Sequence, residues 1–297
     1  MKADNQKIDK MPGIKLFDGE KLLVIISMLG FGLAVGIAVY IGLYGAIIFP
    51  EGDLGRAFSF NAAIALFILS IAAILPIAGL STRKRAAIRW TFTLTTLYAY
   101  AVETIQHFRG INPRFTRAGS AIDSIAGTLF GLDSLLIIIV TVLLAIPFYR
   151  KRQTNERPLL VLGIRYALFS TIIAFASGIW MIALQGRYTG EAGNLIVLHG
   201  LSFHALQALT LLGWLSERAY TCRRHALRRI HFGGFAWTLS IVLIGLQTAL
   251  GCSVFELTVL PLLSGAMLLI WLVIFVAVAF KLLRPKPVSA NPSSHRN

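Results

Sequence analysis

The chain has 297 residues, of which 56% are hydrophobic and only 14% charged, and its mean hydropathy is +0.73. A soluble domain has roughly a quarter of its residues charged, so the composition excludes an ordinary soluble protein. The net charge of +15 would be compatible with nucleic-acid binding if the basic residues formed one face. They form short clusters between apolar stretches, such as Arg83-Lys84-Arg85 and Arg150-Lys151-Arg152. Such clusters orient a chain in a membrane, so the lipid bilayer is the expected partner and nucleic acid is not.

Eight apolar runs follow one another along the chain. A helix needs about 20 residues to cross roughly 30 Å of hydrocarbon at about 1.5 Å per residue. Runs of this length lie at residues 21–49, 59–80, 88–108, 124–148, 158–184, 194–216, 230–252 and 257–281. Backbone groups in lipid must bond within their own segment, and the runs lack the alternation of barrel strands. The sequence therefore predicts an all-α, polytopic transmembrane helix bundle with about eight spans.

The loops predict how this bundle is oriented and divided. Basic residues gather at the N-terminus, in alternate loops and in the C-terminal tail, whereas the other loops hold only five arginines. By the positive-inside rule both termini are cytoplasmic, and we expect a multi-pass protein of the cell (plasma) membrane. Residues 1–20 are expected to be a cytoplasmic segment, residues 21–283 the transmembrane domain, and residues 284–297, rich in Pro and Ser, a disordered cytoplasmic tail.

Two patterns bear on helix packing. In the first span Gly32 and Gly36 form a small-xxx-small motif that predicts close approach of a neighbouring helix. The third and seventh spans each contain a Trp-Thr pair and a Gln followed four residues later by Gly. These residues are Trp90, Gln106 and Gly110 in the third span, and Trp237, Gln247 and Gly251 in the seventh. The two spacings differ by six residues, so no single register aligns both features and the sequence does not establish a repeat.

Ionisable residues inside the spans are the first candidates for function, because burying them in lipid costs several kcal/mol unless they are paired or hydrated. Glu103 and His107 share one face of the third span. His199 and His204 lie in the sixth span, at a similar expected depth on the outer side. We therefore expect these four residues to converge on one site in the outer half of the bundle.

The chemistry of these side chains leaves several functions open. Imidazole and carboxylate ligands are typical of zinc, iron or copper sites, and two histidines on different helices can be the axial ligands of a haem. His107, His199, His204 and Glu103 are thus candidate metal ligands in a redox or metal-dependent protein, although the cofactor itself is not determined. Arg109, Arg114 and Arg187 lie in the outer loops, where they could anchor haem propionates or another anionic small molecule.

The same polar residues are also compatible with two other functions. In a secondary transporter or permease, Glu103 would be the proton carrier. In a non-catalytic subunit of a membrane complex, these polar groups would only form hydrogen bonds between helices. Asp133 and Arg165, on consecutive spans, are expected to form a structural ion pair. The sequence does not decide whether the protein is an enzyme.

Overall fold

Eight long helices make up most of the chain that the structure describes. The computed structural model describes residues 15–150 and 157–283, so residues 1–14, residues 151–156 and the whole predicted tail (284–297) lie outside the description. The helices are α1 (Lys21–Tyr44), α2 (Leu54–Ile74), α3 (Thr82–Phe108), α4 (Ala121–Tyr149), α5 (Pro158–Leu184), α6 (Leu195–Ala219), α7 (Arg223–Ala249) and α8 (Val259–Leu283). A short 3-10 helix, η1 (Leu75–Ala78), continues α2. The predicted all-α bundle is confirmed.

Seven of these eight helices are long and apolar enough to cross a membrane, and α3 is the exception. It begins with Arg83, Lys84, Arg85 and Arg89, and its face toward the bundle carries threonines and the Glu103–His107 pair. These polar side chains are buried against neighbouring helices, because α3 packs on α1, α2 and α4. The low hydropathy of α3 thus results partly from polar side chains that are buried between helices inside the bundle.

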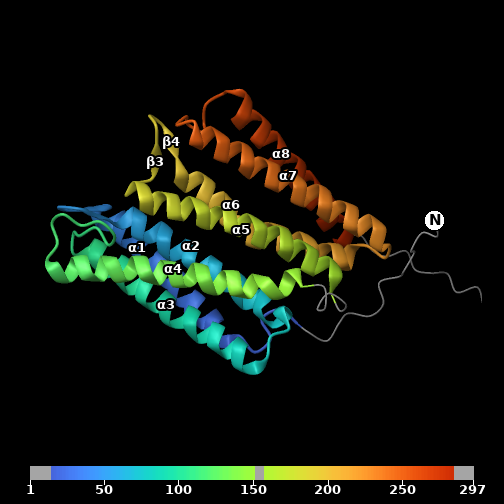
Figure 1. The fold of residues 1–297 in the computed structure, drawn as a ribbon, viewed down its shortest axis with the longest axis horizontal. Coiled ribbons are helices and arrows are strands. Elements are labelled where there is room, and N and C mark those ends of the chain that lie inside the picture. Colours follow the sequence, from blue (N-terminus) through green and yellow to red (C-terminus); the bar gives the residue numbers. More distant parts are fainter. Residues whose placement is uncertain (1–14, 151–156, 284–297) are drawn as a thin grey trace, which may run out of the picture.

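Two short β-hairpins and two loops lie at one end of the bundle. Strands β1 (Ile47–Ile48) and β2 (Gly52–Asp53) connect α1 to α2, and β3 (Tyr188–Thr189) and β4 (Gly193–Asn194) connect α5 to α6. The α3–α4 and α7–α8 loops lie at the same end, on the left in Figure 1. We call this the hairpin end. The opposite end carries the clustered arginines and is called the basic end.

The bundle consists of two halves. Helices α1–α4 lie together in the lower part of Figure 1, and α5–α8 lie above them. The halves meet where α2 packs on α6 and α4 on α5. At this interface the ring of Phe67 lies edge-on to that of Phe203 at 5.5 Å, and Gln207 donates a hydrogen bond to Ser70 at 2.5 Å. One continuous hydrophobic core includes residues from both halves.

The two halves are copies of one structural plan, related by a shift of 141 residues. The hairpins pair in the same register, with Ile47 opposite Asp53 in one and Tyr188 opposite Asn194 in the other. In each half a side chain at the end of the hairpin caps the next helix: Asp53 accepts a hydrogen bond from the backbone N–H of Gly55, and Asn194 from that of Ile196. An Asp or Asn at this position satisfies free N–H groups of the first turn.

Backbone hydrogen bonds repeat at the same shift where each hairpin meets the end of α3 or α7. The N–H of Glu51 donates to the carbonyl of Gly110, and that of Ala192 donates to the carbonyl of Gly251. The Gln–Gly features of the third and seventh spans are in register at this shift, whereas the Trp-Thr pairs are not, so no single register aligns both features. Both copies begin at the basic end, so they are parallel repeats, an arrangement found in several transporter folds.

The predicted glycine motif in α1 is not where helices meet. A Cβ added to Gly32 or Gly36 would have no neighbour within 4 Å among the described residues. The close approach occurs at Gly30, where a Cβ would overlap the Tyr100 hydroxyl of α3 and lie 2.9 Å from Ala65. Helix periodicity explains the difference, because Gly30 and the Gly32–Gly36 pair face different sides of α1.

The predicted ion pair between Asp133 and Arg165 does not form. Arg165 instead donates from Nε to the Phe148 carbonyl at 2.6 Å, at the end of α4. Asp133 lies farther along the bundle, near Tyr98, and its Oδ2 has no hydrogen-bond partner in the described part of the chain. The antiparallel course of α4 and α5 leaves Arg165 beside the basic end of α4, too far along the helix for the Asp133 carboxylate.

Candidate functional site

A buried triad of ionisable residues lies near the hairpin end of the first half. Glu103 and His107 are one turn apart on α3, and their side chains are each about 1% exposed. The Glu103 Oε1 lies 3.3 Å from His107 Nε2, and Glu103 Oε2 lies 2.9 Å from an Nη of Arg114. Glu103 lies about five residues before the end of α3, which corresponds to roughly 8 Å of helix. The sequence correctly paired Glu103 with His107, and the structure adds Arg114 to them.

The hydrogen bonding of His107 determines its tautomer. Nδ1 accepts a hydrogen bond from the backbone N–H of Asp53 at 3.0 Å. A neutral imidazole that accepts at Nδ1 carries its proton on Nε2, and Nε2 faces the Glu103 carboxylate. His107 therefore links the β1–β2 hairpin to Glu103, with neither nitrogen facing an open coordination position.

Arg114 reaches Glu103 from the α3–α4 loop. Its guanidinium lies 5.2 Å from the ring centre of Phe60 on α2 and 5.1 Å from that of Phe130 on α4. Aromatic faces stabilise a cation at such distances. The Arg114 side chain remains 37% exposed, while the carboxylate that it covers is buried. Arg114 thus forms the boundary between Glu103 and the hairpin end.

The triad has unused hydrogen-bonding capacity. Glu103 Oε2 and His107 Nε2 are both buried, and neither makes a hydrogen bond of good geometry although charged partners are near. Beside them, Asn61 donates to Thr104 at 2.9 Å, but the Asn61 Oδ1 has no partner within the described residues. Buried polar atoms without partners are uncommon and often mark a functional site.

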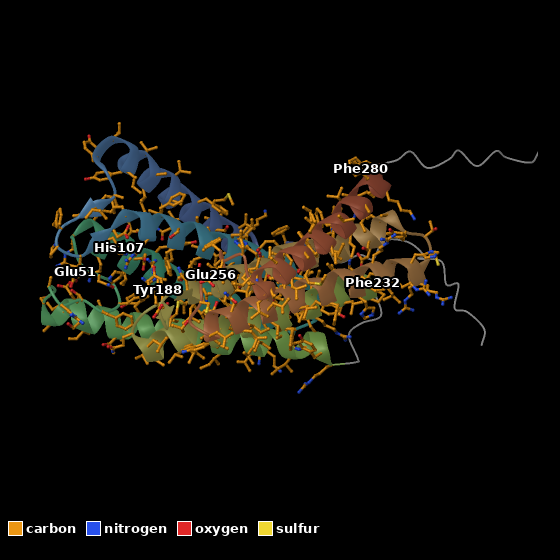
Figure 2. All side chains as sticks on the ribbon, turned by 90° about the horizontal axis from the view of Figure 1, so that it is seen from above. Glu51, His107, Tyr188, Phe232, Glu256 and Phe280 are labelled. Carbon is orange, nitrogen blue, oxygen red and sulfur yellow. The ribbon has the colours of Figure 1, made fainter. Side chains whose placement is uncertain are left out.

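The loop that carries Arg114 is organised by Glu51 of the β1–β2 hairpin. Its carboxylate accepts hydrogen bonds from the Thr116 hydroxyl at 2.6 Å and from the backbone N–H groups of Asn112, Arg117 and Ala118. Figure 2 shows Glu51 at the same end of the molecule as His107. The sequence did not identify Phe60 and Phe130, because their roles depend on contacts between distant segments.

The loop is expected to loosen in acid. The hydrogen bond from the Thr116 hydroxyl, followed by that from the Arg117 N–H, holds the pKa of Glu51 below its ordinary value of 4.5. A carboxyl whose pKa is lowered by folding stabilises the loop above about 4.5, and this contribution is lost as the pH falls through the lowered pKa. Hydrogen exchange of the amides in residues 112–118 should therefore accelerate between pH 5 and pH 3 beyond the intrinsic rate change. In Glu51→Gln this extra pH dependence should disappear, and its persistence would assign it to another group.

Arg109, predicted to anchor an anionic group, is occupied by a carboxylate of the chain. It donates to Asp123 at 2.6 Å, and Gln106 donates to the same oxygen at 3.1 Å. The second half has a similar contact without an arginine, since Gln247 donates to Glu256 at 3.4 Å, and the carbonyls of Gln106 and Gln247 accept from the equivalent N–H groups of Ile111 and Cys252. A contact present in both halves is explained by docking of the loop onto the helix.

The triad, in contrast, occurs in one half only. At the shift of 141 residues, Glu103 corresponds to Ile244 and His107 to Thr248. Ile244 is buried in the hydrophobic core, so the second half closes this region with an apolar side chain. The second half adopts the same fold with Ile244 and Thr248 at these positions. Glu103 and His107 are therefore not required for the fold.

The remaining predicted site residues lie elsewhere in the second half. His199 donates from Nδ1 to the Ala174 carbonyl at 2.8 Å and packs edge-on to Phe203. His204 is exposed and contacts Gln207 at 3.3 Å. Arg187 lies over the Tyr188 ring in the β3–β4 hairpin. His199 is therefore held against α5, whereas His204 faces away from the core.

The predicted metal or haem site gains no support from this arrangement. Within residues 15–150 and 157–283, no three His, Cys, Asp or Glu side chains are grouped so that they could hold a metal ion. Cys222 and Cys252 are free thiols at opposite ends of α7. Comparisons with protein-family models, with curated proteins and with solved structures gave no match.

Proposed function

We propose that this chain is a membrane carrier that moves a small anionic solute together with a proton. Arg114 would bind the anion and Glu103 would carry the proton. The observation that supports this most is the asymmetric ion pair: the carboxylate is buried, while its guanidinium partner comes from a surface loop and remains 37% exposed. The seven apolar helices and two parallel repeats agree with a carrier.

The asymmetry of the pair would couple the two solutes. Arg binds carboxylate or phosphate through two parallel hydrogen bonds. An anion arriving at the hairpin end meets Arg114 first and competes with Glu103 for it. A buried carboxylate without its cationic partner is strongly disfavoured in a low dielectric. Glu103 would therefore take up a proton when the anion takes over Arg114, and would release it when the anion leaves.

His107 would position the carboxylate in both states. Its Nε2–H faces Glu103, and its orientation is held by the Asp53 N–H at Nδ1. In this proposal the imidazole stays neutral and donates to whichever oxygen of Glu103 is not protonated.

The orientation follows from the distribution of charge. With the basic end in the cytoplasm, as the positive-inside rule requires, both termini are cytoplasmic and the triad opens to the outside of the cell membrane. The solute would then enter from outside, and the outside pH would determine the proton supply.

Uptake into proteoliposomes tests this function. Inorganic phosphate, lactate and succinate are added outside vesicles that contain a trapped pH-sensitive dye. At least one anion should cause saturable acidification of the interior. In Glu103→Gln the initial rate should fall roughly tenfold or more, a ratio that corresponds to about 1.4 kcal/mol, because an amide cannot exchange the proton.

Glu191→Gln is the matched control. Glu191 is an exposed carboxylate in the β3–β4 hairpin at the same end of the molecule, without an ion pair in the described residues. This variant should transport like the unchanged protein. The proposal fails if none of the three anions moves protons, or if folded Glu103→Gln is as active as the control. A haem spectrum or bound metal that is lost in His107→Ala would instead favour the redox function.

A further inference from the structure

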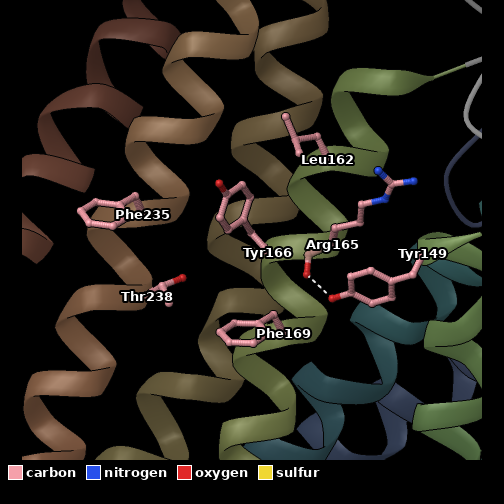
Figure 3. Close-up of a pocket in the computed structure, with 7 residues that line it drawn as sticks. All are labelled: Tyr149, Leu162, Arg165, Tyr166, Phe169, Phe235 and Thr238. Carbon is pink, nitrogen blue, oxygen red and sulfur yellow. Dashed lines mark hydrogen bonds between the residues drawn. The ribbon is translucent and has the colours of Figure 1, made fainter. Parts of the chain in front are cut away.

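A groove on the lipid-facing surface near the basic end is separate from the triad. It lies along α5, between the end of α4 and the middle of α7, and has a volume of about 280 Å³. Its lining is aromatic and aliphatic apart from one guanidinium and one threonine (Figure 3). The residues are Tyr149, Leu162, Arg165, Tyr166, Phe169, Phe235 and Thr238.

Close packing holds the groove in shape. The ring of Tyr166 lies directly against Gly234 of α7, where a Cβ would be 2.6 Å from the ring. The Tyr166 hydroxyl is hydrogen-bonded to His231 Nδ1 at 2.9 Å. On the other side, Tyr149 donates to the Arg165 carbonyl at 2.7 Å, which ties α4 to α5. The floor and one wall are thus fixed by contacts between three helices.

Arg165 supplies a positive charge that the described residues do not neutralise. Its Nε donates to the Phe148 carbonyl, and no carboxylate of residues 15–150 or 157–283 forms an ion pair with it. In Figure 3 the guanidinium extends from α5 toward the beginning of that helix, which is the basic end. A long basic side chain in this position places its charge at the level of lipid headgroups.

A second polar group in the groove also lacks a partner. The Thr238 hydroxyl is buried and forms no hydrogen bond with the described residues. In Figure 3 it points from α7 toward α5, and it lies farther from the basic end than Leu162 does.

We propose that this groove binds one anionic phospholipid, with its phosphate on Arg165 and an acyl chain along Phe169 and Phe235. Basic pockets between helices on the cytoplasmic side recognise anionic headgroups. The two phenylalanines are 48% and 62% exposed, so they offer apolar surface that only lipid or another apolar group would cover. This inference does not depend on the proposed transport.

Native mass spectrometry of the delipidated full chain tests the site, with phosphatidylglycerol and phosphatidylcholine of identical acyl chains as probes. The unchanged protein should retain one phosphatidylglycerol in preference to phosphatidylcholine. Arg165→Gln should lower the apparent affinity for phosphatidylglycerol roughly tenfold, to the level of phosphatidylcholine. Thr238→Trp, which fills the groove and keeps the charge, should weaken the binding of both lipids.

Arg228→Gln is the matched control, because it removes an exposed charge of the same sign near the start of α7. It should leave the preference unchanged. Equal retention of the two lipids by the unchanged protein would overturn the proposal. So would a preference that persists in both Arg165→Gln and Thr238→Trp, or an equal loss in Arg228→Gln.

Discussion

Gly110→Ala is expected to lower the free energy of unfolding by about 3 kcal/mol or more, the range in which backbone clashes and strained dihedrals fall. Gly110 has a φ of 73°, which side chains rarely adopt, and a Cβ there would overlap the Phe49 carbonyl oxygen of the β1–β2 connection. The neighbouring N–H of Glu51 donates to the Gly110 carbonyl. The substitution would therefore push the hairpin away from α3 and disturb the loop that carries Arg114.

The second half provides a parallel test of the same contact. Gly251 has a φ of 76°, and its Cβ would lie 2.8 Å from the Cα of Gly190 in the β3–β4 hairpin. Gly251→Ala should therefore also be destabilising. Gly36→Ala is the control, because it faces open space within α1 and replaces Gly by a better helix former, a gain of up to about 1 kcal/mol.

Thermal or denaturant unfolding in detergent would measure these differences, with intrinsic fluorescence as the signal. Because both halves have the same close contact, Gly110→Ala and Gly251→Ala should each have a clearly lower free energy of unfolding than Gly36→Ala. If Gly110→Ala is as stable as Gly36→Ala, the close backbone approach at the hairpin end is not a requirement of the fold.

Glu20→Ala is expected to destabilise the first half by about 3–5 kcal/mol, as is typical when one partner of a buried ion pair is removed. Glu20 precedes α1 and is 0% exposed. Its carboxylate accepts from Arg85 at 2.5 Å and from Arg89 at 2.6 Å, so that it fixes the beginning of α1 against the beginning of α3. Without the carboxylate, two cations would be left facing each other.

Arg56→Ala is the matched control for this ion pair. Arg56 forms an ion pair with Asp53 at 2.9 Å at the hairpin end, but its side chain is 52% exposed. Exposed pairs contribute about 0–1 kcal/mol, so this variant should unfold close to the unchanged protein. If Glu20→Ala and Arg56→Ala lower the free energy of unfolding by similar amounts, burial of Glu20 does not explain how much its ion pairs stabilise the fold.

The two copies in the bundle distinguish contacts at the hairpin end that occur in both halves from residues that occur in only one half. Hydrogen bonds of Gln106 and Gln247 recur in both halves and are explained by the fold. The triad of Glu103, His107 and Arg114 has no counterpart in the second half, where Ile244 is buried in the core at the Glu103 position. We expect function to reside in such a difference, because the fold is already complete without it in the other copy.

The sequence by itself determined the fold class and the location of Glu103 beside His107. Runs of about 20 apolar residues can only be helices in lipid, and residues four apart on a helix share a face. Both conclusions depend on local geometry, which a linear pattern contains.

Only the tertiary structure decided which residues meet across helices and loops. It brought Arg114 onto Glu103 and Glu51 onto the α3–α4 loop, turned His204 outward, and placed Arg165 on the carbonyl of Phe148 instead of on Asp133. It also aligned the two halves, whose common features are mainly backbone hydrogen bonds and left-handed glycines. The physical reason is that such contacts depend on the rotation of each helix and on the course of each loop, and side-chain identity alone specifies neither.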